Sequence, residues 1–212
     1  MLRSLELKGL YVITDRGLSR GRGDDDVVAA ALRGGASVVQ LREKELAPED
    51  LLPLARRLAA MCRQAGALFI VNDDPELAAA AGADGVHLGP TDMPPARARA
   101  ILGPGAIVGW SIKASVEAAH QAEQLGVSYV AVGSIFPTTT KAGATPVGVE
   151  AIGQVRAAVK LPVAAIGGIN AGNVAPVMAA GADMACVIGA AVSALDVEAA
   201  CRELIRGFGS AK

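Results

Sequence analysis

The chain has 212 residues, of which 52% are hydrophobic, 19% are charged and 3% are aromatic, with a formal net charge of −1. A chain of this length and composition can bury a sizeable core. The small net charge and the scarcity of aromatic residues argue against a surface for nucleic acid or anionic lipid. No signal-peptide pattern or uninterrupted membrane-spanning run is found, and the three cysteines form no C-x-x-C pair, so we expect a cytoplasmic protein with reduced thiols.

Short apolar runs alternate with helical spacing along the whole chain. Four of the runs follow a glycine-closed helix end and repeat one pattern, at residues 34–41, 82–89, 126–133 and 181–189. Four more apolar runs lie at residues 10–14, 68–72, 107–111 and 163–167. The intervals with helical spacing are residues 24–34, 48–66, 75–82, 94–102, 115–126, 149–159, 172–181 and 197–208. Near-continuous apolar strands indicate a parallel sheet buried on both faces. The eightfold alternation predicts a single α/β domain over residues 1–212, a (β/α)8 TIM barrel, with a doubly wound open sheet as the alternative.

A row of polar side chains follows the second predicted strand. Because strand residues alternate between two faces, Gln40, Arg42 and Lys44 share one face, and Leu41 and Glu43 share the other. One amide and two cations at a strand end suit an anion such as a phosphate or diphosphate. The alternative is a solvated strand end with an Arg–Glu pair.

Two carboxylates, Asp73 and Asp92, follow the third and fourth predicted strands. In a TIM barrel the C-terminal ends of the strands carry the active site. Two carboxylates with room for water suit Mg²⁺, which takes few protein ligands together with substrate phosphates. The alternative for Asp73 is an N-cap for the helix at Pro75, although Asp74 is better placed to cap it.

The last two strands end in glycine-rich turns. Gly167-Gly168 and Ile188-Gly189 match the usual phosphate site of such barrels, in which backbone N–H groups face the anion. The alternative is that these glycines only make turns. The loop at residues 137–141 carries three hydroxyls and a cation, which favours ligand binding over an ordinary polar loop. His87 lies inside a predicted strand, where a lone histidine is more often a satisfied core residue, and we assign it no role.

Several motifs together resemble the thiamine phosphate synthase family. They are residues 11–15 (YVITD), 40–44 (QLREK), 71–73 (VND), 82–89 (GADGVHLG), 136–141 (FPTTTK) and 165–169 (AIGGI). The resemblance covers nearly the whole chain. It implies a transferase that couples 4-amino-2-methyl-5-(diphosphooxymethyl)pyrimidine to a phosphorylated thiazole with Mg²⁺, releasing thiamine phosphate and diphosphate.

The resemblance also implies roles for individual residues. The pyrimidine diphosphate would be held by Gln40, Leu41, Arg42, Glu43, Lys44, Asn72, Ser111 and Lys141, of which Arg42, Lys44, Ser111 and Lys141 would be catalytic. The thiazole phosphate would be held by Thr138, Thr139, Thr140, Gly168, Ile188 and Gly189. Mg²⁺ would be bound by Asp73 and Asp92. The expected partners are these small molecules, without nucleic acid or membrane, and a homo-oligomer is left open.

The residue inventory is compatible with this chemistry. The sequence shows no Cys–His or Ser–His pair for covalent catalysis, and none is needed if diphosphate leaves first and the aminopyrimidine stabilises the resulting cation. Three positions depart from the family pattern, namely Pro90, Ser134 and Lys113. The alternatives are a thiazole tautomerase, which uses a histidine near Lys113, a sugar-phosphate isomerase, and a non-catalytic phosphate-binding barrel.

Overall fold

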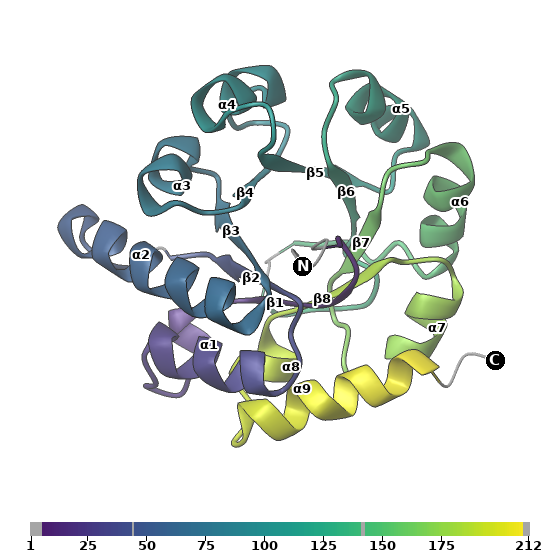
Figure 1. Ribbon diagram of the computed structural model, residues 1–212. Helices are drawn as coiled ribbons and strands as arrows, with labels where there is room; N and C mark the ends of the chain where they lie inside the picture. The colour runs from purple at the N-terminus through teal and green to yellow at the C-terminus, as the bar shows by residue number, and fades with distance from the viewer. Residues whose placement is uncertain (1–5, 44, 141–142, 210–212) are drawn as a thin grey trace.

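Eight parallel strands close into a barrel, and a ring of helices surrounds it (Figure 1). The computed structural model describes residues 6–43, 45–140 and 143–209. The strands follow one another around the barrel in chain order, and β1 pairs with β8 to close it. The predicted TIM barrel is confirmed, and the open-sheet alternative is wrong because no edge is left between the first strand and the last.

The predicted elements are present with small shifts of their ends. The strands are β1 (Gly9–Ile13), β2 (Val38–Leu41), β3 (Leu68–Asn72), β4 (Gly85–Leu88), β5 (Ile107–Lys113), β6 (Tyr129–Val132), β7 (Val163–Ile166) and β8 (Met184–Val187). The α-helices of the described residues are α1 (Asp24–Arg33), α2 (Pro48–Ala65), α3 (Pro75–Ala81), α4 (Pro95–Leu102), α5 (Val116–Gln124), α6 (Glu150–Ala158), α7 (Val174–Ala179), α8 (Gly189–Val192) and α9 (Val197–Arg206). The 3-10 segments there are η1 (Arg16–Leu18) and η2 (Gly207–Gly209). The short helix α8 was not predicted.

Capping by neighbouring residues explains why the turn residues of the sequence predicted the helix ends correctly. The side chains of Asp74, Ser115 and Asp196 each accept a hydrogen bond from a backbone N–H in the first turn of the helix that follows. Gly66 and Gly82 close α2 and α3 in the left-handed conformation, which a residue with a Cβ adopts only at a cost.

The apolar residues form two layers. One cluster lies between the barrel and the helices, and includes Val12, Val39 and Leu41. The second lies inside the barrel, and includes Tyr11, Ile70 and other inward-facing residues of the strands. Successive residues of each strand therefore alternate between these two layers, as the pleat of a barrel strand requires. Among the described residues, no helix has both the length and the apolar character needed to cross a membrane.

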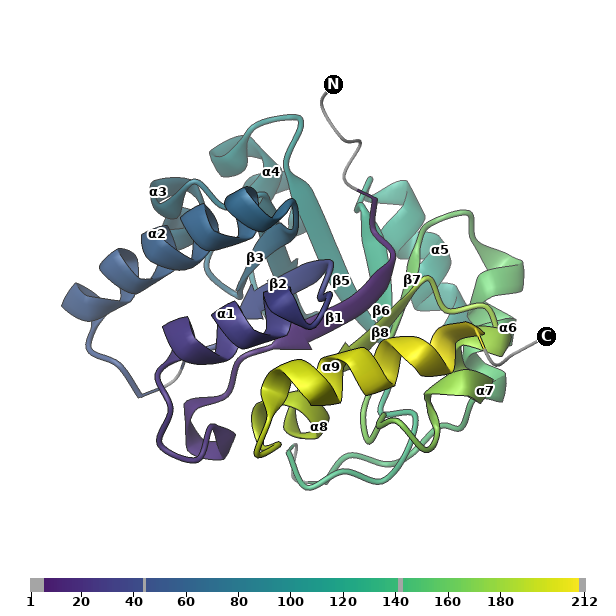
Figure 2. The ribbon, with the colours of Figure 1, turned by 60° about the horizontal axis from the view of Figure 1, so that its bottom comes forward.

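All the strand C-termini point to one end of the barrel. In Figure 2 this end lies at the bottom, where η1, α8 and the long connection between β6 and α6 gather, opposite the side from which the chain enters β1. The segments that follow different strands are thereby brought to a common end.

Candidate active site

The predicted site residues that the structure describes lie at or just beyond the C-terminal ends of strands. Gln40 and Leu41 belong to β2, Asn72 to β3 and Ser111 to β5, whereas the remaining predicted residues lie in the segments that follow the strands. Since the strands are parallel, these residues share one end of the barrel. Lys44 and Lys141 lie outside the described residues.

The end of β2 directs Gln40 and Arg42 to different partners. Gln40 is only 3% exposed, and its Nε2 donates a hydrogen bond to Tyr11 Oη at 2.7 Å inside the barrel. Arg42 comes after the strand, and its backbone N–H donates to Thr14 Oγ1 at 3.0 Å. Its guanidinium contacts Asp15 Oδ2 at 3.1 Å, so the Arg42 cation is held at the barrel end by the loop after β1. The side chain of Leu41 is buried in the layer between barrel and helices.

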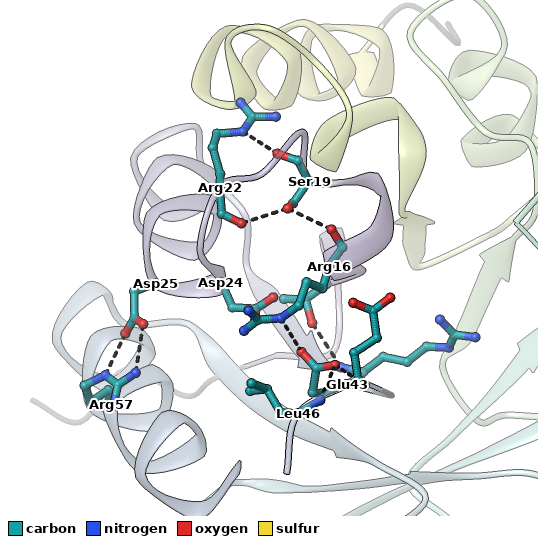
Figure 3. A network of polar contacts seen from close by, with 11 residues as sticks. Arg16, Ser19, Arg22, Asp24, Asp25, Glu43, Leu46 and Arg57 are labelled. Atoms are coloured by element: carbon teal, nitrogen blue, oxygen red, sulfur yellow. Dashed lines mark hydrogen bonds and ion pairs between the residues drawn. The ribbon is translucent and has the colours of Figure 1, made fainter. Parts of the chain in front are cut away.

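Glu43 lies in a network that braces the loop after β2 (Figure 3). Arg16 Nε donates to Glu43 Oε2 at 2.9 Å, and Arg16 also contacts Asp24 Oδ2 at 3.0 Å. The other carboxylate oxygen of Glu43 accepts the backbone N–H groups of Glu45 and Leu46. Burial raises the pKa of Asp24 above its ordinary value, and the charge of Arg16 opposes that rise. The network joins η1, α1 and this loop on one side of the site.

Asp73 and Asp92 come together beside Asn72 and Arg42. The pKa of Asp73 is raised, first by partial burial and then by the negative charge and hydrogen bond of Asp92, while a hydrogen bond from Asn72 and the charge of Arg42 lower it. Asp73 has a φ of 64°, which is uncommon for a residue with a Cβ. The N-cap of α3 is Asp74, whose Oδ1 accepts the N–H of Leu77 at 2.8 Å. Capping therefore does not account for Asp73.

The carboxylate pair has the donor chemistry of a magnesium site. The pair consists of hard oxygen ligands that repel each other, and a divalent cation between them would relieve that repulsion. No group of three or more potential metal-binding His, Cys, Asp or Glu side chains occurs in the described part of the chain. Mg²⁺ suits such a sparse set, because it keeps several waters and takes its remaining ligands from substrate phosphates.

The turns after β7 and β8 present backbone rather than charged side chains. Gly167 and Gly168 have φ values of 107° and 66°. A Cβ on Gly168 would lie 2.4 Å from the carbonyl oxygen of Pro137, so this turn packs against the loop that carries Thr138, Thr139 and Thr140. Ile188 is the N-cap residue of α8, and Gly189 is its first residue. The first N–H groups of a helix have no partner within it.

A chain of hydrogen bonds crosses the interior of the barrel and joins Gln40 to Ser111. Tyr11 Oη lies 3.0 Å from Tyr129 Oη, which lies 2.8 Å from His87 Nδ1. His87 Nε2 lies 2.9 Å from Ser111 Oγ. We call these five residues the barrel chain. Burial lowers the pKa of His87 to about 4, which keeps the ring neutral at neutral pH, and burial raises the pKa values of both tyrosines.

The barrel chain extends what the sequence indicated. His87 is satisfied at both ring nitrogens, as expected for a core histidine, but one partner is the predicted site residue Ser111. The sequence showed no Ser–His pair, because 24 residues separate the two. Tyr11 and Tyr129 were missed as site-related residues. The available signal was a polar hydroxyl at an inward-facing position of an otherwise aliphatic strand.

The sequence matches one protein-family model, described as thiamine monophosphate synthase, over residues 10–191. The chain belongs to this family. The match spans all eight barrel strands except the first residue of β1, and it also covers the turns in which the predicted site residues lie.

Named members of the thiamine monophosphate synthase family are close to this chain along nearly their full length. A thiamine-phosphate synthase of Methanoculleus marisnigri is 50% identical over 204 residues, which cover 96% of each chain. One from Moorella thermoacetica is 48% identical over 196 residues, 92% of this chain and 93% of the relative. The solved structure of a thiamine phosphate pyrophosphorylase from Pyrococcus furiosus is 40% identical, covers 94% of each chain and superposes with a TM-score of 0.86.

Proposed function

We propose that this chain is a thiamine-phosphate synthase. It condenses 4-amino-2-methyl-5-(diphosphooxymethyl)pyrimidine with 4-methyl-5-(2-phosphooxyethyl)thiazole and releases thiamine phosphate and diphosphate. With the carboxylated precursor of that thiazole as the second substrate, carbon dioxide is released as well. The similarity to named synthases supports the activity. The observation that carries the site assignment is the Asp73–Asp92 pair beside Asn72 and Arg42 at the C-terminal end of the barrel.

The pyrimidine diphosphate is assigned to the side of the site formed by β2, β3 and β5. Arg42 is half-buried and carries the charge that a diphosphate needs, and Asp15 holds it in place. Asn72 and Ser111 supply neutral polar groups at the ends of their strands. Lys44 and Lys141 remain predicted contacts of the diphosphate. Glu43 acts in this proposal through the loop it braces, and Leu41 through its backbone.

Asp73 and Asp92 are assigned as the residues that hold Mg²⁺. The ion, when bound, supplies positive charge that favours departure of the diphosphate group. Arg42, together with Lys44 and Lys141, stabilises the same charge from the protein side. Charge stabilisation of a leaving group by prearranged partners is the largest contribution that such a site can make.

The thiazole phosphate is assigned to the opposite side of the same end. The backbone N–H groups around Gly168, Ile188 and Gly189 are suited to an anion, since close approach of the backbone requires the absence of a side chain. Thr138, Thr139 and Thr140 are assigned to line this side, because their loop packs against the Gly167-Gly168 turn.

The reaction proposed is a substitution at the carbon that carries the diphosphate. The C–O bond breaks and its electron pair leaves with the diphosphate, and the thiazole nitrogen then donates its lone pair to form the new C–N bond. No proton has to be removed from the nucleophile. His87 has a lowered pKa of about 4, and is therefore a poor base for activating Ser111 as a nucleophile at neutral pH.

The alternatives receive less support from the site. A single-phosphate isomerase or a non-catalytic barrel has no use for a carboxylate pair next to Arg42 in addition to a backbone phosphate site. A tautomerase of the kind considered above uses a histidine near position 113, where this chain has Lys113. Cytoplasmic location and homo-oligomerisation stay predictions, and the described cysteines Cys62, Cys186 and Cys201 are free and buried.

The decisive experiment is to incubate the purified protein with both substrates and Mg²⁺ and to measure thiamine phosphate and diphosphate by chromatography. We expect the two products in equal amounts. Arg42→Gln should lower the rate by on the order of 10²-fold. Arg97→Gln, which changes an exposed arginine on α4, is the matched control and should leave the rate unchanged. An active protein whose rate is insensitive to Arg42→Gln would contradict the site assignment, and an inactive wild type would contradict the function.

A further inference from the structure

The hydrogen atoms of the barrel chain can be placed from the partners of each group. Tyr11 Oη accepts a hydrogen bond from Gln40 Nε2, so its own hydrogen must point elsewhere. Among the described residues, Tyr129 Oη is the remaining partner of Tyr11 Oη. If Tyr129 donated to Tyr11 instead, the hydrogen of Tyr11 would have no acceptor in a fully buried position, which is costly. Tyr11 therefore donates to Tyr129.

The same reasoning continues to Ser111. Tyr129 Oη accepts from Tyr11, so its hydrogen is donated to His87 Nδ1. The neutral imidazole then carries its hydrogen on Nε2, which donates to Ser111 Oγ. The hydroxyl hydrogen of Ser111 is left to donate outside the barrel chain. The hydrogen bonds thus run in one direction from Gln40 to His87, and His87 donates onward to Ser111.

The two ends of the barrel chain therefore present opposite hydrogen-bonding groups, an acceptor at Gln40 and a donor at Ser111. Gln40 Nε2 donates its hydrogen bond to Tyr11 Oη, which leaves the side-chain carbonyl Oε1 of Gln40 to act as an acceptor. No buried side-chain nitrogen or oxygen of the described residues lacks a partner. Because no hydrogen bond among the described residues engages Oε1, that atom is reached from the barrel end. Ser111 offers an O–H donor at the other end of the barrel chain.

We propose that Tyr11, Tyr129 and His87 are positioning residues, which hold Gln40 as an acceptor and Ser111 as a donor toward the substrate. This inference rests on the proposed function. The aminopyrimidine offers an N–H donor that matches Gln40 Oε1, and the diphosphate offers acceptor oxygens that match the Ser111 hydroxyl. A barrel chain of the opposite direction would present an NH₂ group to the amine and a serine lone pair to the diphosphate, which mismatches both.

The direction can be tested in the free protein without substrate. The chain contains two histidines, so His120→Gln, a change at an exposed position of α5, leaves His87 as the single imidazole. Proton–nitrogen NMR correlation of the ring should show Nε2 protonated and Nδ1 bare. In the Tyr129→Phe variant, Nδ1 loses its donor, and the ring should become a mixture of tautomers. A ring protonated on Nδ1 in the parent protein would overturn the inference.

The effect on the substrate is tested by calorimetric binding of the pyrimidine diphosphate alone. Removing the Tyr129 hydroxyl interrupts the barrel chain, so that Gln40 and Ser111 are no longer held in one orientation. Tyr129→Phe should therefore weaken binding of the pyrimidine diphosphate about tenfold, the effect of roughly one hydrogen bond. The KM for the thiazole phosphate should stay unchanged. Met184→Leu, a volume-conserving change at another buried position inside the barrel, should bind like the wild type. Equal binding by Tyr129→Phe and the wild type would overturn the positioning role even if thiamine phosphate is made. Failure to make thiamine phosphate despite tight, Tyr129-dependent binding would instead contradict the proposed function.

Discussion

Gly109 in β5 gives the most direct prediction about the barrel interior. A Cβ at this position would lie 2.1 Å from Cζ and 2.4 Å from Oη of Tyr129. The Tyr129 side chain is fully buried, stacks on His87 with ring centroids 5.5 Å apart, and is hydrogen-bonded on both sides. The Gly109→Ala variant must therefore displace the ring by about an ångström, since contacts under 3.0 Å are essentially never seen for a real Cβ.

The size of the effect follows from these contacts. Overpacking a core typically costs about 1–3 kcal/mol, and each weakened hydrogen bond adds about 0.5–1.5 kcal/mol. We expect Gly109→Ala to lower the free energy of unfolding by about 3 kcal/mol. For a chain of this size, that corresponds to a fall in Tm of roughly 6–12 °C. Pyrimidine diphosphate binding should weaken as well, because the barrel chain is broken at Tyr129.

The measurement is thermal and urea unfolding followed by circular dichroism. Gly105→Ala is the matched control, because a Cβ at Gly105 meets nothing within 4 Å. That variant should stay within about 0.5 kcal/mol of the wild type. If Gly109→Ala were as stable as Gly105→Ala, the Tyr129 ring would have room to move, and the tight packing on which the barrel chain depends would be refuted.

Two further predictions concern the ligand sites. Asp73→Asn should lower kcat by a factor on the order of 10²–10³ and flatten the Mg²⁺ dependence in single-turnover assays. The neighbouring change Asp74→Ala should instead cost about 1 kcal/mol of stability through the lost N-cap of α3 and leave kcat near the wild-type value. The reverse pattern would show that the two roles are exchanged. Gly168→Val should raise the KM for thiazole phosphate far more than the KM for the pyrimidine diphosphate. A Cβ at this position would lie 2.4 Å from the carbonyl oxygen of Pro137 and would shift the turn. An unchanged KM for thiazole phosphate would count against the backbone phosphate site.

Much of the fold was predictable because it is encoded locally. Apolar runs and glycine or proline boundaries placed β1 within one residue at each end and α3 within one residue at its C-terminus. Capping by Asp74 was likewise predictable, because an N-cap contacts a backbone group only three residues away. The helix α8 was missed because its four residues are too few to show a periodic pattern.

Pairing between distant residues was not predictable from spacing alone. Arg42 could have paired with the adjacent Glu43, but it contacts Asp15, while Glu43 contacts Arg16 from the loop after β1. The alternation rule placed Gln40 and Arg42 on one face. In the structure β2 ends at Leu41, so the rule no longer applies to Arg42, and the two side chains have different partners.

The sequence by itself determined the eight strand–helix units, the parallel sheet and the polar residues at the strand ends, since each depends on a pattern within a few neighbouring residues. Only the tertiary structure decided that Tyr11 and Tyr129, 118 residues apart, share a hydrogen bond inside the barrel. Closure of the barrel sets which residues of opposite strands face each other across its interior, and the register of every strand contributes to that closure. Barrel closure therefore joins Ser111, His87 and Gln40 into one hydrogen-bonded group. No local sequence pattern encodes that grouping.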